Sequence, residues 1–273
     1  MQINVVSFQL KELFDKSQSA LVILGDNMDN DLACLAASLV EIFGAYKKQS
    51  LLLTNRELPI AARPLVKPEF IRAKLDPESL VISFDWAAAQ LDKVSYNIEG
   101  NRFDLIVNSH GKRINPADIT YSYKGQKFDL VLTVGVANLE ELRNFGVELD
   151  LFNRLPSLNF DTNRENTQFA KINLVSTTTD GVCYLATNTF KNAKILLPTK
   201  AAEIMLVGIR EATNNFTAVS DPTTFEAAAY LKRCMIPGMV SFEKETTKTE
   251  ETEKQETPEN WLSPKIFRSS RVS

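Results

Sequence analysis

Acidic and amide side chains crowd into one short loop near the start of the chain. The apolar run ALVIL at residues 20–24 is followed by residues that carry side-chain oxygen atoms: Asp26, Asn27, Asp29, Asn30 and Asp31. Oxygen ligands at the carboxyl end of a strand can bind hard divalent cations. Asp and Asn also form turns and cap helix N-termini, where negative charge is favourable. Taken alone, the loop favours capping, and both interpretations stay open.

The strands and helices that must position this loop alternate along the chain. Short apolar runs predict strands at 20–24, 50–54, 79–84, 128–135 and 155–160. Amphipathic patterns predict helices at 31–46, 138–146, 179–192, 199–213 and 221–235. Because the strands are apolar on both faces, we expect an α/β fold with a mostly parallel sheet covered by helices on both faces. Residues 94–111 break this alternation and predict a hairpin turning at 99–101, either an insertion or an antiparallel edge.

Composition limits the setting of this domain. The chain has 273 residues, 44% of them hydrophobic, enough to bury one sizeable core. The net charge of −3 argues against strong nucleic-acid binding. No apolar run reaches the ~18 residues of a membrane helix, and residues 1–16 lack a signal-peptide pattern. Cys34, Cys183 and Cys234 lack CxxC spacing, so we expect reduced core thiols and a cytoplasmic protein without membrane contact.

The composition changes abruptly near residue 240. We predict an α/β domain at 1–240, a disordered acidic linker at 241–260 and a short docking segment at 261–273. The docking segment combines basic residues with large apolar ones: Trp261, Leu262, Ile266 and Phe267. Such a segment can bind a partner protein, mediate self-association, or fold back onto its own domain. The sequence leaves these three occupants open.

Four loops that follow predicted core elements form a recognisable series: GDNMDND, GVAN, DTNREN and REATNNF. Their order and spacing resemble the DHH (also DDH) phosphoesterase superfamily, including RecJ-type exonucleases, nanoRNases and pAp phosphatases. The resemblance covers most of residues 15–240. It implies an N-terminal phosphoesterase-like domain. We expect no counterpart of the family's C-terminal DHHA1-type domain, which clamps substrate, because the predicted linker begins where that domain would start.

The resemblance places several non-ligating residues where the family has metal ligands. In the first loop Asp29 and Asp31 match the two family aspartates, but Gly25 stands at the histidine position and Met28 at the proline position. Asp161 matches the first residue of the Asp-His-His motif. The other ligand positions hold residues that lack the expected carboxylate or imidazole: Gly135, Thr162, Asn163 and Ala212. The last loop keeps its scaffold residues Gly208, Ile209, Thr213 and Phe216.

These departures decide the expected function. Family members use two Mn²⁺ ions, which activate water and stabilise the attacking and leaving oxygens. Three carboxylates, Asp29, Asp31 and Asp161, could hold at most one Mg²⁺ or Mn²⁺ weakly, so we expect no bound metal cofactor. We therefore predict a catalytically degenerate binding or scaffolding module. The alternative is a reduced, metal-dependent phosphoesterase that acts on nucleotides or short oligonucleotides.

Other chemistries find little support in the residues. The chain has one histidine, His110, which lies in or beside the predicted hairpin, so a Ser-His-Asp or Cys-His site is not expected. No Gly-x-Gly-x-x-Gly or Walker-type loop follows the first strand. A third candidate is a regulatory domain that binds a nucleotide without cleaving it. Its anion-binding residues would be Asn163, Arg164 and Asn166, with Lys112 and Arg113 near one another in sequence.

Overall fold

The computed structural model describes residues 2–27, 29–60, 62–76, 79–85, 90–110, 112–125, 127–177 and 180–240. Met28, the predicted linker and the predicted docking residues Trp261, Leu262, Ile266 and Phe267 lie outside the described residues. None of the helices in the described ranges combines the length and the apolar character needed to cross a membrane.

The strands belong to one large sheet and two small ones. The strands of the large sheet are β1 (Ser19–Leu24), β2 (Gln49–Leu53), β3 (Ile71–Arg72), β8 (Leu130–Val134), β9 (Ser157–Asp161) and β10 (Ile172–Val175). The small sheets pair β4 (Ser79–Ser83) with β7 (Thr120–Lys124), and β5 (Leu91–Glu99) with β6 (Arg102–Ser109). In the part of the chain that is described, the large sheet has the order β10-β9-β8-β1-β2-β3, and all of its pairings are parallel.

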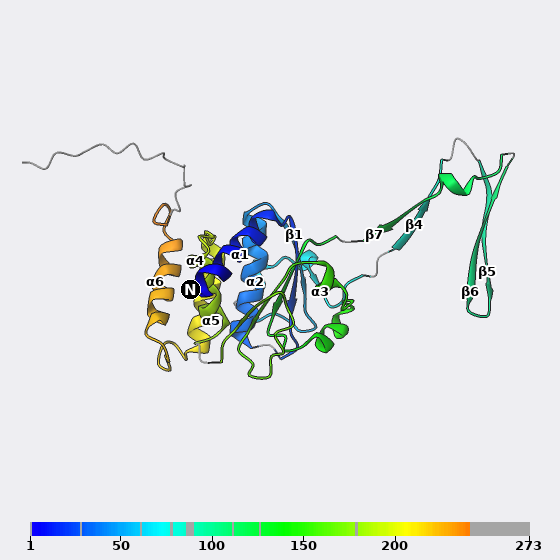
Figure 1. Ribbon diagram of the computed structural model, residues 1–273. Helices are drawn as coiled ribbons and strands as arrows, with labels where there is room; N and C mark the ends of the chain where they lie inside the picture. Colours follow the sequence, from blue (N-terminus) through cyan, green and yellow to red (C-terminus); the bar gives the residue numbers. More distant parts are fainter. Residues whose placement is uncertain are drawn as a thin grey trace, which may run out of the picture. The chain divides into compact units, whose positions relative to one another are not determined.

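Helices alternate with the strands of the large sheet. The α-helices are α1 (Gln2–Lys16), α2 (Asn30–Ala45), α3 (Leu151–Arg154), α4 (Val182–Asn192), α5 (Thr199–Ala212) and α6 (Thr223–Cys234). Short 3-10 helices are η1 (Arg63–Leu65), η2 (Pro68–Phe70), η3 (Pro116–Asp118) and η4 (Leu139–Phe145). Figure 1 shows α1, α2, α4 and α5 on one face of the large sheet and α3 on the other. The predicted α/β fold is confirmed.

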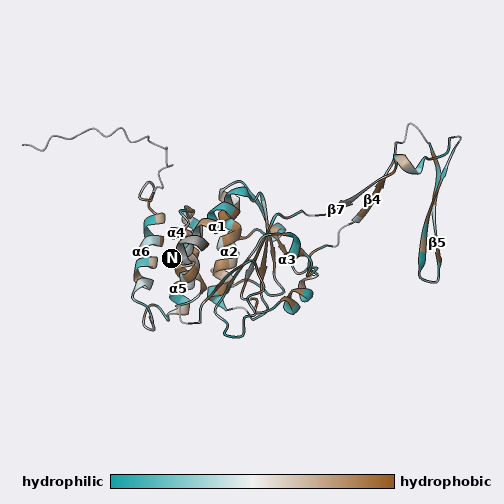
Figure 2. Ribbon diagram, viewed as in Figure 1, coloured by the Kyte–Doolittle hydropathy of each residue, from teal (hydrophilic) through white to brown (hydrophobic). Residues whose placement is uncertain are grey.

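Both faces of the central strand are buried, which explains its unbroken apolar sequence. Ala20, Val22 and Leu24 of β1 pack into a core shared with α2, α4 and α5. The alternate residues Leu21 and Ile23 pack into a second core, on the side of η4 and α3. Helix α2 is buried along most of its length, and Figure 2 colours it mostly brown, for apolar residues. The loops at the carboxyl end of the sheet therefore follow strands that are packed on both faces.

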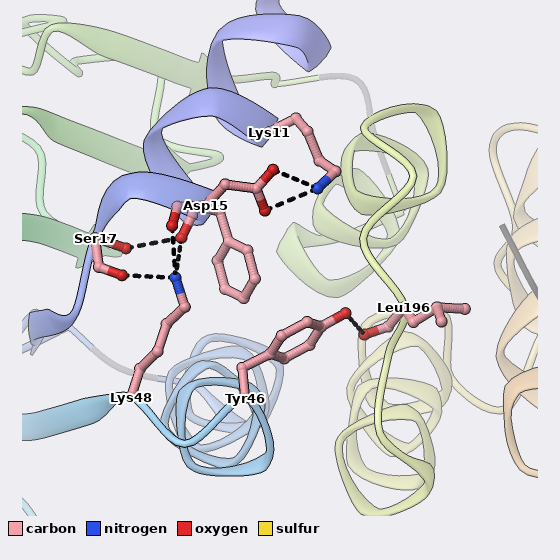
Figure 3. Close-up of polar contacts among 7 residues, drawn as sticks. Lys11, Asp15, Ser17, Tyr46, Lys48 and Leu196 are labelled. Carbon is pink, nitrogen blue, oxygen red and sulfur yellow. Dashed lines mark hydrogen bonds and ion pairs between the residues drawn. The ribbon is translucent and has the colours of Figure 1, made fainter. Parts of the chain in front are cut away.

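Lys48 binds the C-terminal end of α1, a helix that the sequence patterns did not predict. The Lys48 ammonium donates to the carbonyl oxygens of Phe14, Asp15 and Ser17, the last at 2.6 Å. Figure 3 shows these contacts at the C-terminus of α1. The same ammonium lies 4.6 Å from the centre of the Phe14 ring. These contacts satisfy carbonyls that a helix end leaves without partners.

Two expectations about individual elements need correction. The apolar run at 79–84 was expected to join the parallel sheet, but β4 pairs only with β7, and antiparallel, within the described residues. Its Leu80 and Ile82 side chains are exposed, so a continuous apolar run did not mean burial. The segment at 138–146 is a 3-10 helix, η4, rather than an α-helix. The hairpin at 94–111 is confirmed as β5–β6, turning at Gly100 with a φ of +57°.

Candidate functional site

The loops at the carboxyl end of the large sheet bring the candidate residues together. Gly25 directly follows β1, Gly135 follows β8, and Asp161 ends β9, and these three strands are neighbours. The Gly25 amide donates to the carbonyl oxygen of Val134 at 2.9 Å, and the Gly135 amide donates to that of Phe160 at 2.9 Å. The hydrogen bonds between parallel strands thus extend to Gly25 and Gly135. These are two of the positions at which the resemblance would place metal ligands.

The two glycines leave no room for side chains at these positions. A Cβ atom on Gly25 would overlap the carbonyl oxygen of Gly135. Gly135 has a φ of +65°, and a Cβ there would lie 2.9 Å from the Cδ1 atom of Leu32. Residues other than glycine rarely adopt that backbone conformation. A histidine at position 25 would require the backbone to move, whereas an aspartate at position 135 would be strained by its positive φ and would displace the end of the Leu32 side chain.

Asp29 caps helix α2. Its Oδ1 atom accepts a hydrogen bond from the Leu32 amide at 2.8 Å, and its backbone is extended, as expected for an N-cap residue. The side chain is exposed. The carboxylate therefore satisfies one of the free amides at the start of α2 and complements the positive end of that helix.

Asp31 caps a different helix, far along the chain. Its two carboxylate oxygens accept hydrogen bonds from the amides of Val182, at 2.5 Å, and Cys183, at 3.1 Å, at the N-terminus of α4. The side chain is only 5% exposed. Burial raises the pKa of Asp31 to about 6, although the hydrogen bonds from Cys183 and Val182 favour the charged form.

Two glycines make space for the buried Asp31 carboxylate. A Cβ atom on Gly208 would lie 2.8 Å from its Oδ1 atom, and a Cβ on Gly181 would overlap its Oδ2 atom. Gly181 has a φ of +105°, which favours glycine for a second reason. Gly208 also matches a glycine of the family that the sequence resembles. In this chain, its lack of a side chain leaves room for the Asp31 carboxylate that caps α4.

Asp161 organises the loop that follows β9. Its Oδ1 atom accepts from the amides of Thr162, at 2.8 Å, and Asn163, at 3.1 Å. Its Oδ2 atom accepts from the Nδ2 atom of Asn166 at 2.6 Å. All three donors belong to the same loop, so this carboxylate holds together a turn of its own chain.

The first and last loops of the series share a small pocket. Asp29, Asn30, Asp31, Glu211 and Ala212 line a cavity of about 180 Å³. Asn30 donates its Nδ2 proton to the Oε2 atom of Glu211 at 3.0 Å, which ties the two loops together. Sequence reasoning missed Glu211, although it directly precedes the substituted position Ala212.

A second acidic side chain that sequence reasoning missed lies near Asp161. Glu141 accepts from the amide of Ala137 and from the Nδ2 atom of Asn138. Burial raises the pKa of Glu141, and the charges of Asp161 and Asp26 raise it further. The feature of the sequence that could have indicated Glu141 is its position shortly after Gly135, in the segment that forms η4.

The retained scaffold residues of the last loop support its backbone. Thr213 is buried at the end of α5, and its hydroxyl accepts from the Phe216 amide at 3.1 Å. Asn214, Asn215 and Phe216 all have positive φ angles, and the Arg210 guanidinium donates to the Asn215 side chain at 2.8 Å. This strained turn is held by named contacts, so its conformation is specified by the sequence.

The donor atoms do not fit a pair of Mn²⁺ ions. Among the described residues, no three His, Cys, Asp or Glu side chains converge on a point that could hold a metal ion. The oxygens of Asp31 and Asp161 already accept hydrogen bonds from amide groups. A two-metal centre needs several carboxylate or imidazole ligands around both ions, and this end of the sheet does not supply them.

The remaining candidates lie elsewhere or carry other roles. His110 is exposed next to the β5–β6 hairpin. Lys112 and Arg113 line a pocket with Phe84 and Asp85, and the residues that line this pocket do not include Asn163, Arg164 or Asn166. Of the cysteines, Cys34 and Cys183 are buried and Cys234 is half-buried, all as free thiols, as expected of core residues. Of the residues expected to bind a nucleotide, Asn163 and Arg164 are exposed.

Comparison with known proteins gives a likeness in fold. No protein-family model matches the sequence, and no curated protein matches it. Among solved structures, the chain is similar to an exopolyphosphatase-related protein from Bacteroides fragilis, with a TM-score of 0.57 and 9% sequence identity. The match covers 85% of this chain and 57% of that one, so this chain spans less than two thirds of its neighbour. The likeness shows that the two chains share their α/β fold.

Proposed function

We propose that this chain is a catalytically degenerate DHH-type phosphoesterase domain that works as a binding or scaffolding module. One observation carries the proposal. Each of the three carboxylates that match family ligands accepts hydrogen bonds from amides of its own chain: Asp29 from Leu32, Asp31 from Val182 and Cys183, and Asp161 from its own loop. The former ligands have become structural caps, and the fold is retained without the chemistry.

The alternative is a reduced phosphoesterase that uses a single ion. It requires a Mg²⁺ or Mn²⁺ held by Asp29, Asp31 and Asp161, with water completing the coordination. Binding would have to displace the amide donors of two helices and one turn, at about 0.5–1.5 kcal/mol for each hydrogen bond. The exposed Asp29 is the carboxylate with the fewest donors among the three, and it is the residue on which the two accounts differ most.

Hydrolysis assays test the proposal. We expect purified full-length protein with Mn²⁺ to release no product above the metal-only background from a short RNA or from pAp. Asp29→Asn is the matched control, because asparagine caps a helix about as well as aspartate and should leave the fold intact. Metal-dependent turnover that disappears in Asp29→Asn would overturn the proposal and establish the reduced enzyme.

The proposed module needs a binding partner. We propose that it engages a protein through the segment at 261–273 or through the carboxyl end of the sheet, with a nucleotide as a further candidate ligand at Asn163 and Arg164. The placement of exposed amide side chains in that loop is compatible with a polar ligand.

A further inference from the structure

The β5–β6 hairpin, here called the ribbon, has an apolar face over its three pairs from Val94–Val107 to Ile98–Phe103. In its antiparallel register Val94 is opposite Val107, Tyr96 is opposite Leu105, and Ile98 is opposite Phe103. Residues opposite each other in a ladder share a face, as do alternate residues along a strand. The apolar face of the ribbon therefore consists of Val94, Tyr96, Ile98, Phe103, Leu105 and Val107.

This apolar face is open to solvent. Tyr96 is 67% exposed, Ile98 64% and Phe103 62%. The rings of Tyr96 and Phe103 stack with their centroids 5.6 Å apart, which makes a flat aromatic surface. A two-stranded hairpin is at best marginally stable alone in water. The ribbon therefore needs a covering surface, and within the described residues its large apolar side chains have none.

Between Val94 and Val107 the charged residues of the ribbon lie on its opposite face, and Asp92 lies at the irregularity of β5 beyond this stretch. Glu99 pairs with Arg102, and Asn97 with Asp104, in the register that points away from the apolar face. Arg102 also forms an ion pair with Asp104 at 2.8 Å. A face without charge offers no anchor for a charged ligand such as a nucleic acid. Its complement must be apolar and of similar size, and the ribbon of a second copy meets both conditions.

We propose that the apolar face of the ribbon is a self-association surface, on which the ribbons of two copies pack face to face about a two-fold axis. A two-fold contact brings the same patch of both copies together, so an uncharged face is complementary to itself. Two aromatic and four aliphatic side chains offer roughly 600 Å² per copy, and two copies bury roughly 1,200 Å². That area is at the lower limit of stable specific interfaces.

Molar mass in solution tests the pairing. We expect sedimentation equilibrium of the full-length protein to give twice the chain mass of 30.6 kDa at micromolar concentration. Tyr96→Glu with Phe103→Glu should raise the dissociation constant at least about 100-fold. Ser95→Glu with Asn97→Glu, on the opposite face, is the matched control and should leave the dissociation constant within about threefold.

Several results would overturn the pairing. A mass of one chain at all concentrations would mean that the face is covered within the chain, for instance by the exposed Leu80 and Tyr121 of β4–β7, or by another protein. Masses above two copies would exclude a closed two-fold contact. Equal effects of the two double substitutions would show that the face is not the contact.

Chemical cross-linking keeps the test valid if the glutamate variant unfolds the ribbon. Tyr96 lies at the middle of the apolar face, so a two-fold axis through the face brings its two copies close. We expect Tyr96→Cys with a short bismaleimide to give at least about tenfold more covalent dimer than Asn97→Cys, which places the thiol on the opposite face. Equal yields from the two variants would contradict the face-to-face arrangement.

Discussion

Gly25→Ala is expected to lower the free energy of unfolding by about 3 kcal/mol, the upper end for an overpacked core. The added Cβ atom would overlap the carbonyl oxygen of Gly135, at the junction of β1 and β8. The contacting atoms belong to the backbone of Gly135 and Val136, directly after β8, so no side-chain rotation can relieve the overlap. Chemical denaturation of the two proteins, monitored by circular dichroism, measures the difference.

Gly44→Ala is the matched control for this prediction. Gly44 lies in the last turn of α2, and a Cβ atom there would meet nothing within 4 Å. Alanine should stabilise the helix by about 0.5–1 kcal/mol. If Gly25→Ala instead matched the wild type within about 0.5 kcal/mol, the strand ends could separate. The glycine at position 25 would then have no explanation in backbone packing.

Asp31→Asn is expected to lower the free energy of unfolding by about 1–3 kcal/mol at pH 5, because it leaves an amide at the start of α4 without an acceptor. Both carboxyl oxygens of Asp31 accept from α4, and both can still accept when the group is protonated, whereas asparagine offers one oxygen and one NH₂ group. Denaturation of both proteins at several pH values between 4 and 7.5 gives the difference and its pH dependence.

The sign of that pH dependence follows from the raised pKa. Burial raises the pKa of Asp31 from 3.8 to about 6, so the folded state binds more protons than the unfolded state between these values. The contribution of Asp31 is therefore fully present below pH 3.8 and is lost as the pH rises through 6. The difference corresponds to at most about 3 kcal/mol. The advantage of the wild type over Asp31→Asn should shrink by up to this amount between pH 4 and pH 7.

Asp29→Asn separates this effect from a general effect of the loop. Asparagine at an N-cap accepts the same hydrogen bond, so the change should be less than about 0.5 kcal/mol. A pH-independent difference between wild type and Asp31→Asn, or equal losses for Asp29→Asn and Asp31→Asn, would contradict the buried-cap account.

The sequence predicted the elements whose signals are local. The uninterrupted apolar run of β1, the N-cap before α2 and the turn at Gly100 all follow from neighbouring residues. The partner of β4 could not be predicted, because the apolar run at 79–84 carries no information on which strand it pairs with. The C-terminal end of α1 is bound by Lys48, which is more than 30 residues away from the carbonyls that it contacts.

In the candidate site, too, the residues could be predicted from the sequence, whereas their contacts could not. The predicted strand ends and the family resemblance together located Asp29, Asp31 and Asp161 at the carboxyl end of the sheet. Their present roles depend on long-range packing: Asp31 bonds to an amide 151 residues away, at the start of α4. The lack of room for a Cβ atom on Gly25 likewise arises because the ends of β1 and β8 lie close together. Residue types showed which positions of the resemblance lack a carboxylate or imidazole group, and only the fold showed which hydrogen bonds Asp29, Asp31 and Asp161 accept.

Isothermal titration of the full-length protein with Mn²⁺ tests the central claim most directly. The account predicts no saturable heat at micromolar to submillimolar Mn²⁺, because the carboxylates of Asp31 and Asp161 are engaged by amides of their own chain. Micromolar binding that Asp29→Asn abolishes would contradict it, and would establish a working metal site at the end of the sheet.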